Sequence, residues 1–136
     1  MSAGFAPLGQ DDSFLGHVGG LTWHRQDDRT DVRLEVQTHH LNPNGHAHGG
    51  VLFTLMDITL GATVESFLGE NPAGHPITVQ LSSSLMGSAR QGETILGQAQ
   101  VESSTRTLTF VDGRLTSGDG RLLMTARAVF RNPPRA

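Results

Sequence analysis

The chain has 136 residues, the length of one domain, so we expect residues 1–136 to form a single core with residues 1–14 as an entry segment. The net charge is −3 and all ten cationic residues are Arg, so no basic surface favours nucleic acid or an anionic membrane as a partner. The chain contains no Lys, Tyr or Cys. These absences exclude Schiff-base chemistry, a Walker A loop, thiolate nucleophiles, disulfides and Cys-ligated zinc.

The N-terminus carries no targeting pattern. Residues 1–10 lack the cationic and apolar regions of a signal peptide. We find no run of about 18 apolar residues, the length that spans a membrane. We therefore expect a soluble, cytoplasmic protein with no membrane partner.

The first half of the chain predicts two strands and a polar loop. Residues 21–24 suit a short strand, and residues 30–38 alternate apolar and polar side chains, which predicts a half-buried strand. Residues 39–50, HHLNPNGHAHGG, have no apolar pattern and predict a loop.

Residues 51–68 form the one strong helix pattern, with apolar side chains on nearly every face, which predicts a helix buried on most sides. Only strand patterns follow, at residues 77–86, 93–102, 105–116 and 121–131. Because strands and helices do not alternate, we expect an α+β fold with an antiparallel sheet. A sheet curled around one helix leaves its convex face open, so that face must either be polar or be covered, and we expect a second copy of the chain to cover it.

Asp57 is the only charged residue between Val51 and Val64. One interpretation is an exposed position or a structural hydrogen bond. The other is a catalytic carboxylate, because a charge buried in an apolar helix is costly and usually has a function.

His48, Gly49 and Gly50 immediately precede the helix pattern. A helix N-terminus presents unpaired N–H groups, and glycine lets a ligand approach them, which suits a polarised carbonyl or an oxyanion. The alternative is a plain N-cap made permissive by glycine.

Two other chemistries have less support. The histidines of the loop, His39, His40, His46 and His48, suggest a metal, but no carboxylate with ligand spacing accompanies them, so we expect no metal and no cofactor. The run 82–84 contains three serines without the G-x-S-x-G pattern of a serine hydrolase.

Taken together, the loop and helix carry the pattern N-x-x-G-x-x-H-G-G-x6-D, formed by Asn42, Gly45, His48, Gly49, Gly50 and Asp57. This pattern resembles the signature of the hotdog-fold acyl-CoA thioesterases in the PaaI-like, phenylacetate-pathway branch. The resemblance covers about residues 15–131. It implies a hotdog fold, in which an antiparallel sheet of five to six strands wraps around one long central helix, and hydrolysis of an acyl-CoA thioester.

The resemblance also implies roles for individual residues. Asp57 would act as nucleophile or general base, and the Gly49 N–H would polarise the thioester carbonyl. Asn42 and His48 would support that loop, and Thr78 would orient the hydrolytic water. For substrate binding we add Gly50 at the helix start, and Arg90 and Arg106 as phosphate partners; a solvated surface Arg is the alternative for the last two.

The resemblance further implies a homodimer joined edge to edge, with dimers pairing into a homotetramer. The distance between Gly49 and Asp57 gives a second argument for a shared active site, and this argument does not depend on the resemblance. Gly49 and Asp57 are eight residues apart, about 12 Å along a helix, whereas a reacting carbonyl must lie about 3–3.5 Å from its attacker. One chain cannot supply both groups to one carbonyl, so we expect Asp57 of one subunit to face Gly49 of the other.

The prediction is therefore an acyl-CoA thioesterase acting on an aryl or medium-chain acyl group. The main alternative is a non-catalytic acyl-CoA-binding hotdog domain, a ligand sensor, which would have no use for Asp57 and Thr78. A hydratase of the same fold would need a His paired with Asp or Glu in another register, which we do not find. A purely structural dimer module is the remaining alternative.

Overall fold

The computed structural model describes residues 4–135. Its elements are, in chain order, β1 (Ala6–Pro7), α1 (Phe14–Val18), β2 (Leu21–Arg25), β3 (Thr30–Glu35), the 3-10 turn η1 (Thr38–His40), α2 (Gly49–Leu68), β4 (Ile77–Leu85), β5 (Thr94–Ser104), β6 (Leu108–Ser117) and β7 (Leu122–Arg131).

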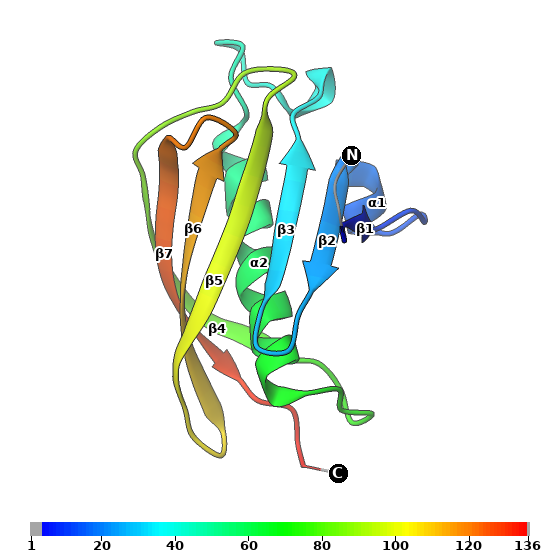
Figure 1. Ribbon diagram of the computed structural model, residues 1–136, viewed down its shortest axis with the longest axis vertical. Helices are drawn as coiled ribbons and strands as arrows, with labels where there is room; N and C mark the ends of the chain where they lie inside the picture. The colour runs from blue at the N-terminus through cyan, green and yellow to red at the C-terminus, as the bar shows by residue number, and fades with distance from the viewer. Residues whose placement is uncertain (1–3, 136) are drawn as a thin grey trace.

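All the strands form one antiparallel sheet in the order β1-β2-β3-β5-β6-β7-β4, and α2 lies along one of its faces (Figure 1). This confirms the predicted α+β arrangement of an antiparallel sheet around one long helix. The sheet has seven strands rather than five or six. The additional strand is β1 in the entry segment, which has only two residues and is held by pairing with Trp23 and Thr22 of β2.

Helix α2 begins at Gly49 and ends at Leu68. At its start the His48 side chain accepts a hydrogen bond from the Gly50 N–H, so it caps the helix. At its end Gly69 adopts a φ of 84°, a conformation that favours glycine, and its N–H bonds to the Glu65 carbonyl. The helix starts two residues before the predicted position because Gly49 and Gly50 form its first turn instead of ending the loop.

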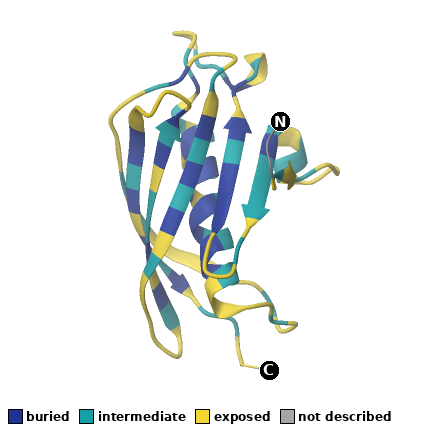
Figure 2. Cartoon of the chain, viewed as in Figure 1, coloured by how far each residue is buried: buried dark blue, intermediate teal, exposed yellow. Residues whose placement is uncertain are grey.

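Small residues let α2 lie close to the sheet. A Cβ atom on Gly97 of β5 would come within 2.2 Å of the Thr59 hydroxyl oxygen on α2, so only glycine fits there. Around this contact the core is mostly apolar, and Figure 2 shows burial concentrated between α2 and the central strands. The largest fully buried apolar side chains include Leu55, Met56, Leu60, Leu34, Ile95, Leu115, Met124 and Phe130.

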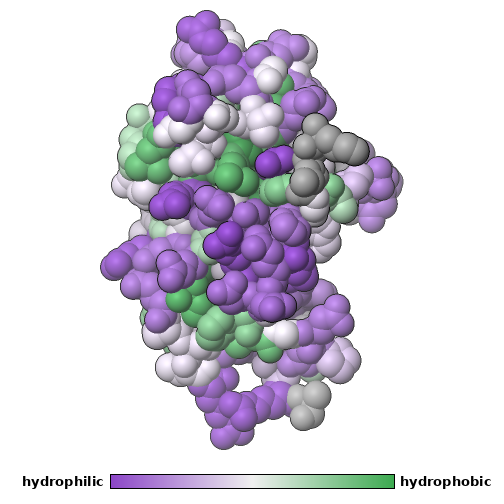
Figure 3. Space-filling view, viewed as in Figure 1, coloured by the Kyte–Doolittle hydropathy of each residue, from purple (hydrophilic) through white to green (hydrophobic). Residues whose placement is uncertain are grey.

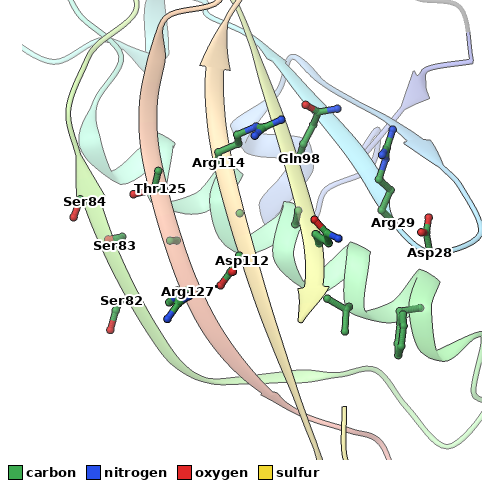
Figure 4. A pocket seen from close by; sticks show the side chains of 16 residues that line it. Asp28, Arg29, Ser82, Ser83, Ser84, Gln98, Asp112, Arg114, Thr125 and Arg127 are labelled. Atoms are coloured by element: carbon green, nitrogen blue, oxygen red, sulfur yellow. Dashed lines mark ion pairs between the residues drawn. The ribbon is translucent and has the colours of Figure 1, made fainter. Parts of the chain in front are cut away.

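The outer face of the sheet, which points away from α2, is polar. Cross-strand neighbours on this face include Gln98, Arg114 and Thr125, and Asp112 pairs with Arg127 at 3.3 Å. Figure 3 shows a hydrophilic band across this face, and Figure 4 shows polar side chains over a broad concavity of about 830 Å³. Of the two alternatives for this face, a covering second copy or a polar surface, the side chains fit the polar surface.

The uncovered apolar surface lies on α2 and β4 instead. Phe53 and Phe67 of α2 and Ile77 and Val79 of β4 are each between 42% and 53% exposed. The prediction that α2 is buried on most sides is wrong for one subunit, because the side of the helix that faces away from the sheet has no covering element.

Helix α2 is apolar enough to cross a membrane by length and composition, with a mean hydropathy of 1.5 in its most apolar stretch. The expectation that no such run exists was therefore too strict. In the structure seven residues of α2 are buried against the sheet, as in the core helix of a globular domain: Leu52, Leu55, Met56, Thr59, Leu60, Thr63 and Val64.

Candidate active site

Asp57 and Thr78 come together across the gap between α2 and β4. The Thr78 hydroxyl donates a 2.7 Å hydrogen bond to Asp57 Oδ1, and both residues are exposed. Within residues 4–135 no hydrogen bond reaches Asp57 Oδ2. One carboxylate oxygen is thus held in place while the other is free to face a substrate or a water molecule.

Thr78 lies beside an irregularity in β4. The pairing of β4 with β7 shifts register between Thr78 and Gln80, so Val79 forms a β-bulge on an edge strand. Bulges are common next to active sites because the local kink changes where a side chain points. Here the residue next to the bulge is the one that contacts Asp57.

The N-terminus of α2 has one unused N–H group. The Gly50 N–H is bound to His48 Nδ1 at 2.9 Å, and the N–H groups of Val51 and Leu52 reach the His48 carbonyl. In the described chain the Gly49 N–H has no partner. The structure therefore leaves Gly49 as a donor and shows Gly50, predicted to bind substrate, using its N–H within the helix cap.

Asn42 shapes the loop before α2. Its side-chain oxygen accepts hydrogen bonds from the N–H groups of Asn44 and His46, and its backbone pairs with His46 and Gly45. Gly45 has a φ of 79°, which this tight turn requires. Asn42 therefore stabilises the fold of the loop that leads to His48, which is the form that its predicted support role takes in one subunit.

His40 connects this loop to the end of α1. It is 2% exposed, its Nδ1 accepts from the Gln37 N–H at 2.9 Å, and its Nε2 bonds to the Val18 carbonyl. Since Nδ1 is an acceptor, the ring is neutral and Nε2 is the donor. Burial lowers the pKa of His40 below 6.5, which keeps this arrangement intact at neutral pH. The His40 carbonyl in turn accepts from the His48 N–H.

A cavity of about 380 Å³ opens beside Asp57 and Thr78. It runs along α2, and β2, β4 and β7 of the sheet contribute to its walls. Its lining combines apolar side chains with a small group of charged ones. The lining residues are Leu8, Leu15, Trp23, Arg25, Asp57, Ile58, Gly61, Ala62, Glu65, His75, Pro76, Thr78 and Phe130. The larger concavity on the outer face contains neither Asp57 nor Thr78, whereas the smaller cavity contains both, so we place the candidate site at the smaller cavity.

Arg90 and Arg106 lie at opposite ends of β5. Arg90 precedes the strand and bridges to His46, near the start of α2, whereas Arg106 follows the strand in the β5–β6 turn (Figure 1). An eleven-residue strand is about 35 Å long. Both side chains are exposed, and one subunit cannot bring both to the same phosphate group.

Besides Asp57, three charged or titratable side chains line the cavity, and none of them was predicted from the sequence: Arg25, Glu65 and His75. Glu65 could have been found, because it lies two helical turns after Asp57. Arg25 and His75 come from β2 and from the connection after α2, and no local pattern relates them to the helix. Among the described residues, no group of three His, Asp or Glu side chains is arranged to hold a metal ion.

Comparison with known families gives a match over most of the chain. Residues 44–124, which include the start of α2, Asp57 and Thr78, match the model of the thioesterase superfamily. The chain is also 33% identical over 132 residues to "Putative esterase PA0474" of Pseudomonas aeruginosa, and the alignment covers 96% of each protein.

Solved structures share the same architecture. The PaaI protein from the phenylacetic acid degradation operon of E. coli superimposes with a TM-score of 0.80 at 16% identity, covering 92% of this chain and 88% of that one. The protein smu.793 of Streptococcus mutans, solved with bound acetyl CoA, gives 0.77 at 24% identity, covering 96% and 100%. At these identities the likeness shows the fold, and it confirms the predicted PaaI-like hotdog arrangement.

Proposed function

The chain belongs to the thioesterase superfamily and is a thioester hydrolase, and we propose that it hydrolyses acyl-CoA thioesters at two sites shared between the subunits of a homodimer. The observation that carries the proposal is the Asp57–Thr78 hydrogen bond, which places an oriented carboxylate at the mouth of a largely apolar cavity. The acetyl CoA bound to the S. mutans protein of the same fold supports the coenzyme as the thiol.

The proposed groups suit the chemistry of a thioester. An aspartate carboxylate is ionised at neutral pH and can act in either of two ways. It can attack the carbonyl carbon and expel the coenzyme A thiolate, leaving an acyl anhydride that water hydrolyses. It can instead take a proton from a water molecule that attacks the same carbon. In both routes negative charge develops on the carbonyl oxygen, where a donor such as the Gly49 N–H is most effective.

The two groups of one subunit are too far apart to act on one carbonyl. Gly49 and Asp57 are separated by eight residues of α2, about 12 Å. A two-fold axis that sets two α2 helices antiparallel would bring Asp57 of one subunit opposite Gly49 of the other, and would do so twice. The free edge of β4 and the exposed Ile77, Val79 and Phe53 side chains support this as the contact surface.

The volume and lining of the cavity limit which acyl group it can hold. Its volume of about 380 Å³ lies at the small end of ligand sites, and Trp23, Phe130, Ile58 and Leu15 contribute apolar lining. We propose an aryl or medium-chain acyl group, because a long chain would exceed this space and an acetyl group would leave most of it empty.

A panel of acyl-CoAs tests the proposal. Acetyl, octanoyl, palmitoyl, benzoyl and phenylacetyl thioesters are incubated with the purified protein, and a colorimetric thiol reagent measures released coenzyme A. The expected result is turnover of the aryl or octanoyl substrates above that of acetyl-CoA and palmitoyl-CoA. The absence of coenzyme A release from every member of the panel, together with tight binding, would instead identify a ligand sensor.

A further inference from the structure

The loop that leads to α2 is closed by a backbone hydrogen bond between its two ends. The His48 N–H donates to the His40 carbonyl at 2.8 Å. Gly49, whose N–H is the proposed donor to the thioester carbonyl, is the residue after His48. Only His48 therefore separates the proposed donor from the His40 peptide group, so the direction of the Gly49 N–H depends on where that peptide group lies.

The His40 ring fixes its own peptide group from two sides. Its Nδ1 accepts from the Gln37 N–H at 2.9 Å, and its Nε2 donates to the Val18 carbonyl. The residue is only 2% exposed, so water does not replace either partner. Both contacts require the neutral ring. In the protonated ring Nδ1 carries a hydrogen of its own and would point it at the Gln37 N–H, which is another donor.

His39 is the titratable neighbour of His40. Its Nε2 also bonds to the Val18 carbonyl, at 2.7 Å, and the centres of the two rings lie 4.1 Å apart. Within residues 4–135 no carboxylate forms a hydrogen bond or an ion pair with the His40 ring. Burial lowers the pKa of His40 most and a charge on His39 lowers it further, while the contacts with the Val18 and Gly19 backbone partly oppose this. The ring is therefore neutral at neutral pH and gains its proton only in acid.

We propose, on the basis of the thioesterase function proposed above, that His40 is a positioning residue for the Gly49 N–H and that only its neutral ring holds this donor in the catalytic direction. A donor to the carbonyl oxygen acts mainly in the transition state, so its misplacement should lower kcat more than it changes KM. Turnover should then fall in acid before an ordinary aspartate carboxylate, with a pKa of about 3.9, takes up a proton.

The first test is the pH dependence of kcat and KM for the acyl-CoA of the panel that is hydrolysed fastest. In the wild type we expect kcat to be constant above about pH 6.5 and to fall below it, with little change in KM. His40→Gln keeps a donor toward Val18 but does not titrate. We expect its kcat to be about tenfold lower at neutral pH and to show no such fall down to about pH 4.5. Circular dichroism checks that each protein stays folded.

Gly49→Pro separates a positioning role from a purely structural one. This variant lacks the N–H that His40 is proposed to direct. Adding His40→Gln to it should therefore change the remaining kcat by less than about twofold, and its acid fall should already be absent. A His40 side chain that only stabilises the loop would instead lower kcat by the same factor in both backgrounds, and that result would overturn the proposal.

Two other histidines serve as comparisons. The His48 ring also lies at the start of α2, where its Nδ1 accepts from the Gly50 N–H. His48→Asn keeps a capping oxygen that does not titrate, so the acid fall in kcat should persist in this variant. His24→Gln, on β2 and outside the cavity, should leave the whole profile unchanged. An acid fall that disappears in His48→Asn and persists in His40→Gln would assign the titration to His48 and overturn the proposal.

Nuclear magnetic resonance tests the coupling without turnover. The amide signal of Gly49 and the ring signals of His40 are followed through the same pH range. In the wild type we expect them to shift with one midpoint, and in His40→Gln the Gly49 shift should be absent. Hydrolysis with no shift of the Gly49 signal would retain the thioesterase and reject the role of His40. A shared midpoint without hydrolysis of any acyl-CoA would retain the coupling and reject the thioesterase.

Discussion

At the scale of single residues, three groups are proposed to carry the chemistry: the Asp57 carboxylate, the Thr78 hydroxyl and the Gly49 N–H. The Thr78 hydroxyl holds the Asp57 carboxylate. The His48 side chain caps the helix by accepting from the Gly50 N–H, which leaves the Gly49 N–H free. The spacing of the loop motif and the lone charge in an apolar helix predicted Gly49 and Asp57, whereas Thr78 was predicted from the family resemblance.

The carboxylate of Asp57 should be indispensable. Asp57→Asn preserves the size of the side chain but removes both its nucleophilicity and its basicity, so we expect kcat to fall by about 10²–10⁴-fold or more. Because Asp57 is exposed, the melting temperature should change little. Asp28→Asn, at an exposed acid in the β2–β3 turn, is the matched control. A folded Asp57→Asn protein with near-normal turnover would refute this role.

The hydroxyl of Thr78 should act mainly in the transition state. Thr78→Ala removes the donor to Asp57 Oδ1, so we expect kcat to fall by about tenfold or more with a smaller change in KM. Thr78→Ser restores a hydroxyl and should recover most of the rate. If Thr78→Ala raises KM alone, Thr78 contacts the substrate and does not hold the carboxylate.

The Gly49 N–H can be deleted without breaking the helix. Gly49 is the first residue of α2 and follows His48, which is extended at φ −61° and ψ 138°. Proline is favoured at a first helical position and after an extended residue, so Gly49→Pro should fold. Loss of one such donor should lower kcat by about 10²–10³-fold. Gly49→Ala, whose Cβ would lie 3.8 Å from Leu85, keeps the N–H and should retain much more activity.

At the scale of elements, regular patterns were predicted well and pairings were not. The bounds of β4, β5 and β7 differ from the predictions by at most two residues, because period-two alternation or β-branched runs mark them. β1 could not be predicted, since a two-residue strand has no period and exists only through its pairing with β2. The Arg25–Glu65–His75 cluster was missed for the same reason: its members meet only in three dimensions.

The loop from η1 to α2 should make the protein sensitive to acid. Burial lowers the pKa of His40, so the unfolded chain takes up a proton near pH 6.5 while the folded chain resists it. Stability from this group is complete above that pH and is lost as the pH falls below it, by at most about 1.4 kcal/mol per pH unit. Urea unfolding at pH 7.5 and pH 5.5 measures the effect.

His40→Gln identifies the source of this pH dependence. The variant should be less stable at neutral pH, because a buried hydrogen-bonded ring is lost, but its free energy of unfolding should vary less with pH than that of the wild type. His17→Gln, at an exposed histidine of α1, should keep the wild-type slope. Equal slopes in wild type and His40→Gln would assign the acid sensitivity elsewhere.

At the scale of the whole molecule, the distribution of surface polarity favours a partner on one side only. The outer face of the sheet is polar across its strands, whereas the free edge of β4 and the adjacent side of α2 expose apolar side chains. An unpaired edge strand with apolar neighbours is a natural site for pairing with another copy. The same side carries Asp57, so assembly and catalysis are expected to depend on one surface.

Complementation between two inactive variants tests the shared active site most directly. Asp57→Asn and Gly49→Pro subunits are mixed in equal amounts, dissociated reversibly and reassembled, and coenzyme A release is measured. A hybrid dimer combines Asp57 of one subunit with Gly49 of the other at one of its two sites. Random reassembly should therefore restore about a quarter of the wild-type activity. Hybrids that demonstrably form yet show no more activity than either parent, or a wild-type protein that is active as a monomer in sedimentation, would contradict the account.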